Sequence, residues 1–362
     1  MTVWRMHADD GATSSVKIFA NIFISFIGAG ILGMPHAFKE AGIIEGSAIM
    51  GLIGTLSVKA MLLIIDCKKK ITWKKFDHLQ NGAVVLSEGK VTLEEKGLLK
   101  LEENEEGWEK LNDELQNPNH DIDYGDLGYY AFGHSGRVVV DLSIVISQIV
   151  GYGWGILNLL IVLVAPVPDE FTSPLAILVN FRHLKKLAIF RIHPQVARIS
   201  GLPFFLGVAI YCYEGAGLIL SLEASCARDS REKFRRDVFK VTLFVVTSLY
   251  IAFGACGYLS FGETTEQMIT LNLPAECFAS LCCAPVWHCG ALHPNFSTLM
   301  AFFGSSCCTL LGFILPGIFH LRIFEGHLTK FEWLVDITLI FLGLVGALIG
   351  TRDALLRLLA GT

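Results

Sequence analysis

The sequence predicts an all-α polytopic membrane protein, on the basis of its composition, its long apolar runs and its uneven charge distribution. Hydrophobic residues make up 52% of the 362 positions and charged residues 17%, against about 25% in soluble domains. Charge concentrates in residues 66–126, which hold 15 acidic and 9 basic side chains. A soluble fold of this length cannot hide so much apolar surface. We therefore expect a membrane-embedded body interrupted by one charged insert.

Seven apolar runs of 19–28 residues are long enough to cross a bilayer as helices. Helices satisfy their own backbone in lipid, whereas barrel strands would be about 10 residues long with alternating polarity. The predicted spans are residues 18–38, 43–65, 138–165, 201–222, 238–261, 297–319 and 331–349. They form a single transmembrane domain over 18–349, with an N-terminus at 1–17, a charged loop at 66–126 and a C-terminal tail at 350–362.

Loop charges predict the orientation of these spans. Basic clusters directly follow the second, fourth and sixth spans, and the linkers after the first, third and fifth are mainly acidic. The basic residues are Lys68, Lys69, Lys70, Lys74, Lys75, Arg228, Arg231, Lys233, Arg235, Arg236, Arg322 and Lys330. Because basic loops stay in the cytosol, we expect a cytosolic N-terminus. The 66–126 insert is then a cytosolic loop, largely disordered, with one amphipathic helix near 93–115.

Several function classes are disfavoured. Outside the insert the chain carries a net charge of +1, so no basic surface for nucleic acid is expected. The cysteines at 277, 282, 283 and 289 lack the paired C-x₂-C spacing of a zinc site. No carboxylate or histidine pair recurs at helical spacing within a span. We therefore expect no enzyme activity, no cofactor and no metal.

The first span contains a glycine-rich run: Gly28, Ala29, Gly30, Ile31, Leu32 and Gly33. It matches the G-x-G-x-x-G pattern of nucleotide-binding folds, but Pro35 follows and no acid lies about 20 residues on, so we reject that interpretation. Within a membrane, the glycines and Pro35 weaken the helix, and freed amides would face an anionic group such as an amino acid carboxylate. Close helix packing through small residues is the alternative.

A second interruption lies midway along the span 201–222, where Glu214 is flanked by tyrosines and glycines. An ionisable group at bilayer depth is costly unless it is buried against a partner or protonated. Glu214 is either a structural acid bridging two half-helices or a proton-binding group, in preference to a direct substrate contact. Paired glycine-interrupted spans are typical of a transporter site between structural repeats.

Several segments resemble, in order, the helices of the amino acid/auxin permease family, most closely its vacuolar and proton-coupled neutral amino acid transporters. Residues 17–39 resemble the family's first helix, and 124–133 resemble the start of its third. The sixth, seventh and tenth helices are matched by residues 201–215, 252–263 and 304–320. The resemblance covers roughly two-thirds of the chain.

The resemblance implies a LeuT-like inverted-repeat fold of five helices plus five and an eleventh. The fold here is incomplete, with about seven clear transmembrane helices and at most eight or nine. Residues 172–191 resemble a shortened fourth helix, and the fifth, eighth and ninth helices have no counterpart. The family's first and sixth helices unwind around the substrate. Carried over, the glycine-rich run from Gly28 to Gly33 would hold the substrate carboxylate, and the second break would contact the rest of the substrate through Tyr211, Tyr213, Gly215, Ala216 and Gly217.

The function implied is secondary active transport of mostly neutral amino acids, by alternating access around the two broken helices. The coupling ion expected is a proton, with sodium as the alternative, and Glu214 is the residue expected to couple it or to bridge the half-helices. A vacuolar or lysosomal membrane is favoured over the plasma membrane. The alternative function is that of a transport-incompetent, shortened membrane protein that regulates or oligomerises with full-length relatives.

Overall fold

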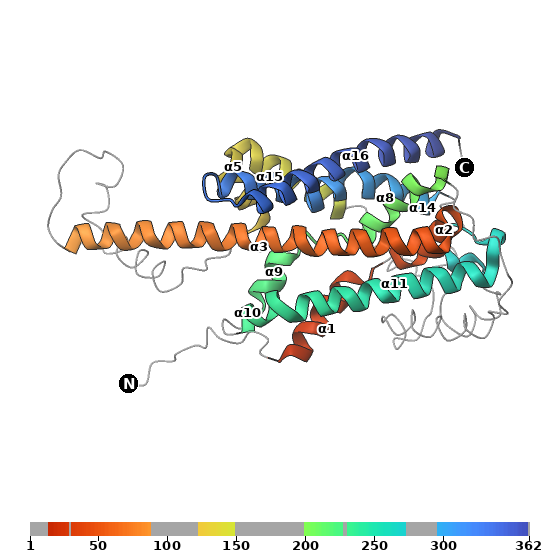
Figure 1. Ribbon diagram of the computed structural model, residues 1–362, viewed down its shortest axis with the longest axis horizontal. Helices are drawn as coiled ribbons and strands as arrows, with labels where there is room; N and C mark the ends of the chain where they lie inside the picture. The colour runs from red at the N-terminus through yellow and green to blue at the C-terminus, as the bar shows by residue number, and fades with distance from the viewer. Residues whose placement is uncertain are drawn as a thin grey trace, which may run out of the picture.

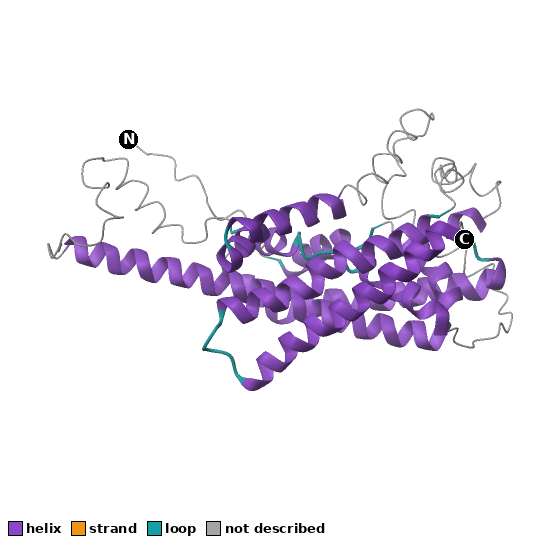
Figure 2. Cartoon of the chain, turned by 90° about the horizontal axis from the view of Figure 1, so that it is seen from above, coloured by secondary structure: helices purple, strands orange, loops and turns teal. Residues whose placement is uncertain are grey.

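The computed structural model describes residues 14–28, 30–87, 122–148, 199–226, 230–272 and 295–360. Every element in these ranges is a helix, and the helices pack into an elongated bundle (Figures 1 and 2). The long helix α3 (Ile43–Ser87) runs through the middle and extends past the bundle at one end (Figure 1). The helices α15 (Leu315–Ile323) and α16 (Lys330–Ala360) lie on one side of α3 in this view, and α11 (Phe239–Phe261) lies on the other.

Four helices of the described residues are long and apolar enough to cross a membrane: Ile43–Lys74, Phe239–Thr264, Phe296–Ile323 and Lys330–Ala360. They coincide with the predicted second, fifth, sixth and seventh spans. The first span becomes two helices, α1 (Ser15–Phe26) and α2 (Gly30–Ala41), whose axes differ by 61°. The described part of the chain therefore holds four membrane spans, or five when the bent pair counts as one.

Two predicted boundaries are corrected. The helix α3 does not end at residue 65 but continues through the start of the predicted loop, because Cys67 and Ile71 still face the core. The helix α16 runs eleven residues into the predicted tail, where Ala354 is buried and Arg357 forms ion pairs with Glu40 and Asp353. The rest of the insert, including the helix expected near 93–115, lies outside the described residues.

The third predicted span begins earlier than residue 138. The helix α5 (Tyr124–Phe132) starts inside the predicted loop, with Asp123 and Asp126 forming a reciprocal capping box at its N-terminus. A further helix covers residues 134–148. The remainder of this span, the fourth-helix segment at 172–191 and the cysteine-rich stretch lie outside the described residues.

The closest helix contact joins α8 (Leu202–Cys212) to the run formed by α14 (Phe296–Phe303) and the π-helix η6 (Gly304–Cys308). A Cβ on Gly304 would overlap the backbone carbonyl oxygen of Gly207, and a Cβ on Gly207 would overlap that of Ala301. Small residues let membrane helices approach to backbone contact, where dispersion and weak polar contacts replace the hydrophobic effect. These two glycines therefore set the spacing of the bundle core.

Gly304→Ala is expected to lower the free energy of unfolding by about 1–3 kcal/mol, because the added methyl pushes α8 away from η6. Thermal unfolding of the purified chain in detergent measures this change. The matched control is Gly312→Ala in the same helical run, since a Cβ there meets no atom within 4 Å. Equal melting temperatures for the two variants would contradict the close contact.

Candidate functional site

The first span is interrupted between Phe26, the last residue of α1, and Gly30, the first residue of α2. The break is shorter than the sequence predicts: Gly30, Ile31, Leu32 and Gly33 are helical, whereas Gly28 lies in the break and Ala29 lies outside the described residues. The helix resumes at once because Gly30 packs directly against the end of α8. The first backbone amides of a helix have no partner within it, and at the start of α2 the amide of Ile31 donates instead to the carbonyl of Gly28 at 3.4 Å.

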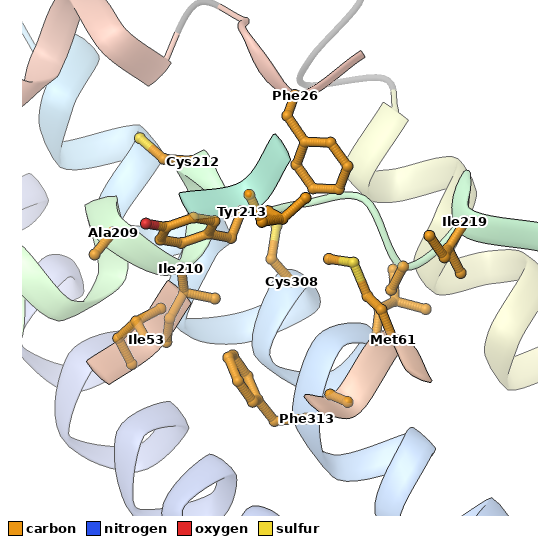
Figure 3. Packing of buried hydrophobic residues seen from close by; sticks show 14 of the residues in the cluster. Phe26, Ile53, Met61, Ala209, Ile210, Cys212, Tyr213, Ile219, Cys308 and Phe313 are labelled. Carbon is orange, nitrogen blue, oxygen red and sulfur yellow. The ribbon is translucent and has the colours of Figure 1, made fainter. Parts of the chain in front are cut away.

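The span 201–222 is interrupted where its glycines predict. The helix α8 ends at Cys212 and α9 (Ile219–Ala224) begins seven residues later. Turn-like hydrogen bonds hold the linker, among them those from the amides of Leu218 and Ile219 to the carbonyl of Gly215, each 3.0 Å. Figure 3 shows Phe26 on one side of this linker and Cys308 and Phe313 on the other.

One tyrosine joins the two breaks. The Tyr250 hydroxyl, on α11, donates to the carbonyl of Phe26 at 2.5 Å and lies 3.3 Å from the carbonyl of Cys212. It also interacts with the backbone of Gly28. The carbonyls at the end of a helix have no partner within it, so this hydroxyl satisfies orphan groups of α1 and α8 together. The sequence signal was a tyrosine inside an apolar span, whose hydroxyl needs a partner once buried.

Glycines let the two breaks touch. A Cβ on Gly30 would lie 2.7 Å from Sγ of Cys212, and a Cβ on Gly215 would overlap the ring of Phe26. By contrast, a Cβ on Gly28 would meet nothing within 4 Å, so this residue borders open space. The two breaks are therefore in contact at Gly30–Cys212 and at Phe26–Gly215, and space remains beside Gly28.

Glu214 lies in the linker with its Oε2 atom buried and without a hydrogen-bond partner among the described residues. Its carboxylate interacts with the Cys308 thiol of η6 and with the backbone of Gly217. The Cys308 thiol in turn lies 3.8 Å from the Ser147 hydroxyl, on the helix 134–148. Glu214 thus connects the linker to a π-helix, a feature that often occurs at functional sites. The unpartnered oxygen is a costly arrangement for a charged carboxylate and favours a protonated one.

The remaining predicted site residues divide into two groups. Tyr213 and Ala216 are buried, at 3% and 1% exposure, and the Tyr213 hydroxyl donates to Thr247 Oγ1 at 2.6 Å. Gly54 on α3 makes room for this hydroxyl. Their side chains therefore serve helix packing. Tyr211 is half-buried beside Gly30 and close enough to Glu214 to interact electrostatically.

The structure therefore brings together Gly28, Gly30, Tyr211, Glu214, Gly215 and Gly217 and places Ile31 in the core. A groove of about 830 Å³ lies elsewhere, between Phe132 of α5 and the loop from α15 to α16, and contains none of the predicted site residues. Among the described residues, no group of three or more His, Cys, Asp or Glu side chains could hold a metal ion.

The far end of α9 is fixed by a buried ion pair. Lys68 Nζ on α3 lies 3.0 Å from Glu223 Oε2, and the two side chains are 6% and 4% exposed. The Arg231 guanidinium donates to the carbonyls of Ala224 and Cys226, which extend past the end of α9. The segment after the second break is therefore anchored to α3, so the break lies between two fixed points.

An all-helical bundle whose interrupted spans meet inside it is typical of membrane transporters. Residues 11–83, 189–283 and 277–356 match the family described as transmembrane amino acid transporter protein. More than half of the chain is matched, so the chain belongs to this family, as the resemblance to the amino acid/auxin permeases predicted. It is accordingly a multi-pass membrane protein of a transporter family and not an enzyme.

Individual relatives align over nearly the whole chain. Amino acid transporter AVT3C of Arabidopsis thaliana is 26% identical over 439 residues, covering 95% of this chain and 91% of the relative. Amino acid transporter ANT1 of the same plant is 25% identical, covering 95% and 92%. Vacuolar amino acid transporter 4 of Saccharomyces cerevisiae is 23% identical, covering 73% of this chain and 36% of the relative.

Tyr250→Phe is expected to destabilise the protein by about 1–3 kcal/mol, because the carbonyls of Phe26 and Cys212 lose a buried donor. Hydrogen exchange should rise at the first turn of α2 and in the linker after α8. Tyr129→Phe is the control, since that ring is 53% exposed on α5. Unchanged exchange at both breaks in Tyr250→Phe would contradict the bridging role.

Lys68→Met is expected to cost about 3–5 kcal/mol, because it leaves the Glu223 carboxylate buried without its cation. The double variant Lys68→Met/Glu223→Leu should recover most of that loss. Thermal unfolding reports both, with Lys69→Met as the control, since the Lys69–Glu232 pair is exposed. Equal melting temperatures for the single and the double variant would contradict a stabilising role of the buried ion pair.

Proposed function

We propose that the chain is a secondary active transporter of neutral amino acids that works by alternating access around the two breaks. The observation that carries this proposal is the Tyr250 hydroxyl, which joins the end of α1 to the end of α8. A ligand that moves either break must also move the other, because both share this hydroxyl. Such coupling is what alternating access requires of its two broken helices.

The helix ends suit a zwitterion. The N-terminus of α2 presents the positive end of a helix dipole, which favours the carboxylate. The C-terminus of α8 presents the negative end of a dipole, which favours the ammonium group. Gly30 and Cys212 bring these ends together, and Gly28 borders open space beside them. Tyr211 lies alongside and is the side chain best placed to contact the substrate.

Glu214 is the proposed proton-coupling group. Its carboxylate interacts with the linker and with Cys308 of η6, so its charge acts on two elements at once. A proton on the unpartnered Oε2 removes the cost of a buried charge and stabilises this arrangement. Release of the proton would favour an arrangement in which the carboxylate reaches water. Sodium binding near the first break is the alternative form of coupling.

The membrane proposed is that of the vacuole or lysosome. The support is the resemblance of the first helix to vacuolar carriers and the yeast relative named a vacuolar amino acid transporter. In an acidic compartment the proton gradient would drive amino acids towards the cytosol.

A second function is favoured by one observation. The alignments to the plant relatives run over 439 and 444 residues, whereas this chain has 362. The relatives therefore carry segments that the chain lacks. A shortened form of this kind would associate with full-length relatives and regulate them without transporting substrate itself.

Uptake into proteoliposomes distinguishes the two functions. The purified chain should show saturable uptake of labelled neutral amino acids that depends on an imposed proton gradient. Glu214→Gln should lower proton-driven uptake at least about tenfold, because the group can no longer exchange a proton. Glu325→Gln, which removes an exposed carboxylate, is the control. Absence of saturable uptake by the unmodified chain would overturn the transporter proposal and favour the regulatory one, which co-purification with a full-length relative then tests.

A further inference from the structure

A buried histidine–aspartate pair joins α15 to α16. His320 Nδ1 and Asp336 Oδ2 lie 2.6 Å apart, and the two residues are 5% and 0% exposed. The helices approach closely here because Gly317, one turn before His320, has no side chain. A Cβ there would lie 2.8 Å from Cγ1 of Ile340. Neither His320 nor Asp336 takes part in the site formed by the two breaks.

The pair differs from a purely structural ion pair in one respect. Asp336 Oδ1 is buried and has no hydrogen-bond partner among the described residues. Among all the described residues, only Glu45 and Glu214 also have a buried carboxylate oxygen without a hydrogen-bond partner. A carboxylate that only holds two helices together is expected to have both oxygens satisfied, because an unmet buried acceptor is costly. The free oxygen therefore favours a carboxylate that changes its protonation.

The surroundings of the pair are electrically balanced. On α3, Cys67 interacts electrostatically with both Asp66 and Asp336. Lys70, also on α3, lies 5.7 Å from the centre of the Phe324 ring. The centre of that ring lies 4.6 Å from the centre of the His320 ring. On α16, Glu332 interacts with His320 and with Lys59 of α3. Arg322 of α15 is paired with Glu325, and α5 presents the rings of Tyr124 and Phe132 to Phe319. With three cations and three anions around it, the net charge at this junction depends on the pair itself.

We propose that His320 and Asp336 form a proton-binding site, separate from Glu214, at the junction of α3, α15 and α16. With the additional proton the pair carries no net charge. Without it, the neutral imidazole can still donate its ring N–H to Asp336, but one uncompensated negative charge remains in an apolar environment. His320 is twelve residues beyond Cys308, the contact of Glu214, which separates the two sites by about 18 Å of helix.

The predicted topology places this site at the cytosolic end of the bundle, next to the basic loop that contains Arg322, His327 and Lys330. Cytosolic pH then sets its occupancy, and loss of the proton weakens the contact between α15 and α16, because it leaves an uncompensated negative charge buried between them. This consequence for transport rests on the proposed function, whereas proton binding itself does not.

Infrared difference spectra of the full chain in nanodiscs, recorded between pH 5 and 8, test the site directly. Carboxyl and imidazole bands of the unmodified protein should disappear in both Asp336→Asn and His320→Gln and persist in Glu214→Gln. His327→Gln, which removes an exposed histidine of the neighbouring loop, controls for ordinary titration. The apolar double variant His320→Phe/Asp336→Leu guards against misfolding, because apolar replacement of a buried pair is often tolerated. Retention of every band in all three pair variants overturns the proposal.

Uptake measured at different cytosolic pH values provides a second test. With the opposite compartment held at fixed pH, the cytosolic pH at half-maximal uptake should shift by about one unit in Asp336→Asn, or the dependence should vanish. An unmodified chain without uptake but with the infrared bands would refute the proposed function and leave the proton site standing. A chain that transports normally, with bands and pH dependence unchanged in the pair variants, would refute only the proton site.

Discussion

The hydroxyl of Tyr250 is the group on which the two broken helices depend. Interrupting a helix inside a membrane exposes backbone carbonyls that water cannot reach, and each such group is costly unless something else satisfies it. Tyr250 meets this requirement with its single O–H donor, which bonds to the carbonyl of Phe26 and also lies within reach of the carbonyl of Cys212. The glycines at 30 and 215 then matter because they let the helix ends come within its reach. Unwinding and close packing, which looked like competing explanations for the glycine-rich run, are therefore parts of one arrangement.

Charged side chains that are buried away from the breaks also need partners. Lys68 and Glu223 neutralise each other at the end of α9, and Arg357 pairs with Glu40 and Asp353 at the far end of α16. Glu214 and Asp336 differ, since each keeps one oxygen without a partner among the described residues. The satisfied pairs fix the scaffold, whereas the carboxylates of Glu214 and Asp336 are the groups that we propose to bind a proton.

Hydropathy alone located four spans that fall on long apolar helices of the structure, because length and apolarity are visible in the sequence. It also located both interruptions, through glycines that weaken a helix. It misplaced the ends of α3 and α16, since a charged helix end can still pack against a neighbour. Lys68 illustrates the reason. In the sequence it belongs to a basic cluster that predicts a loop, whereas in the bundle its side chain is buried against Glu223.

Taken by itself, the sequence determined the class of protein, its helical content and the residues at which two spans break, because these depend on local composition. Only the tertiary structure decided which side chains stabilise the breaks. Tyr250 lies 38 residues from Cys212 and 224 from Phe26, and no local pattern connects them. The same holds for Tyr213, whose hydroxyl bonds to Thr247 on α11 rather than facing a substrate. Orphan polar groups in a membrane take partners from whichever helix lies nearest in space, and that proximity arises only when the bundle packs.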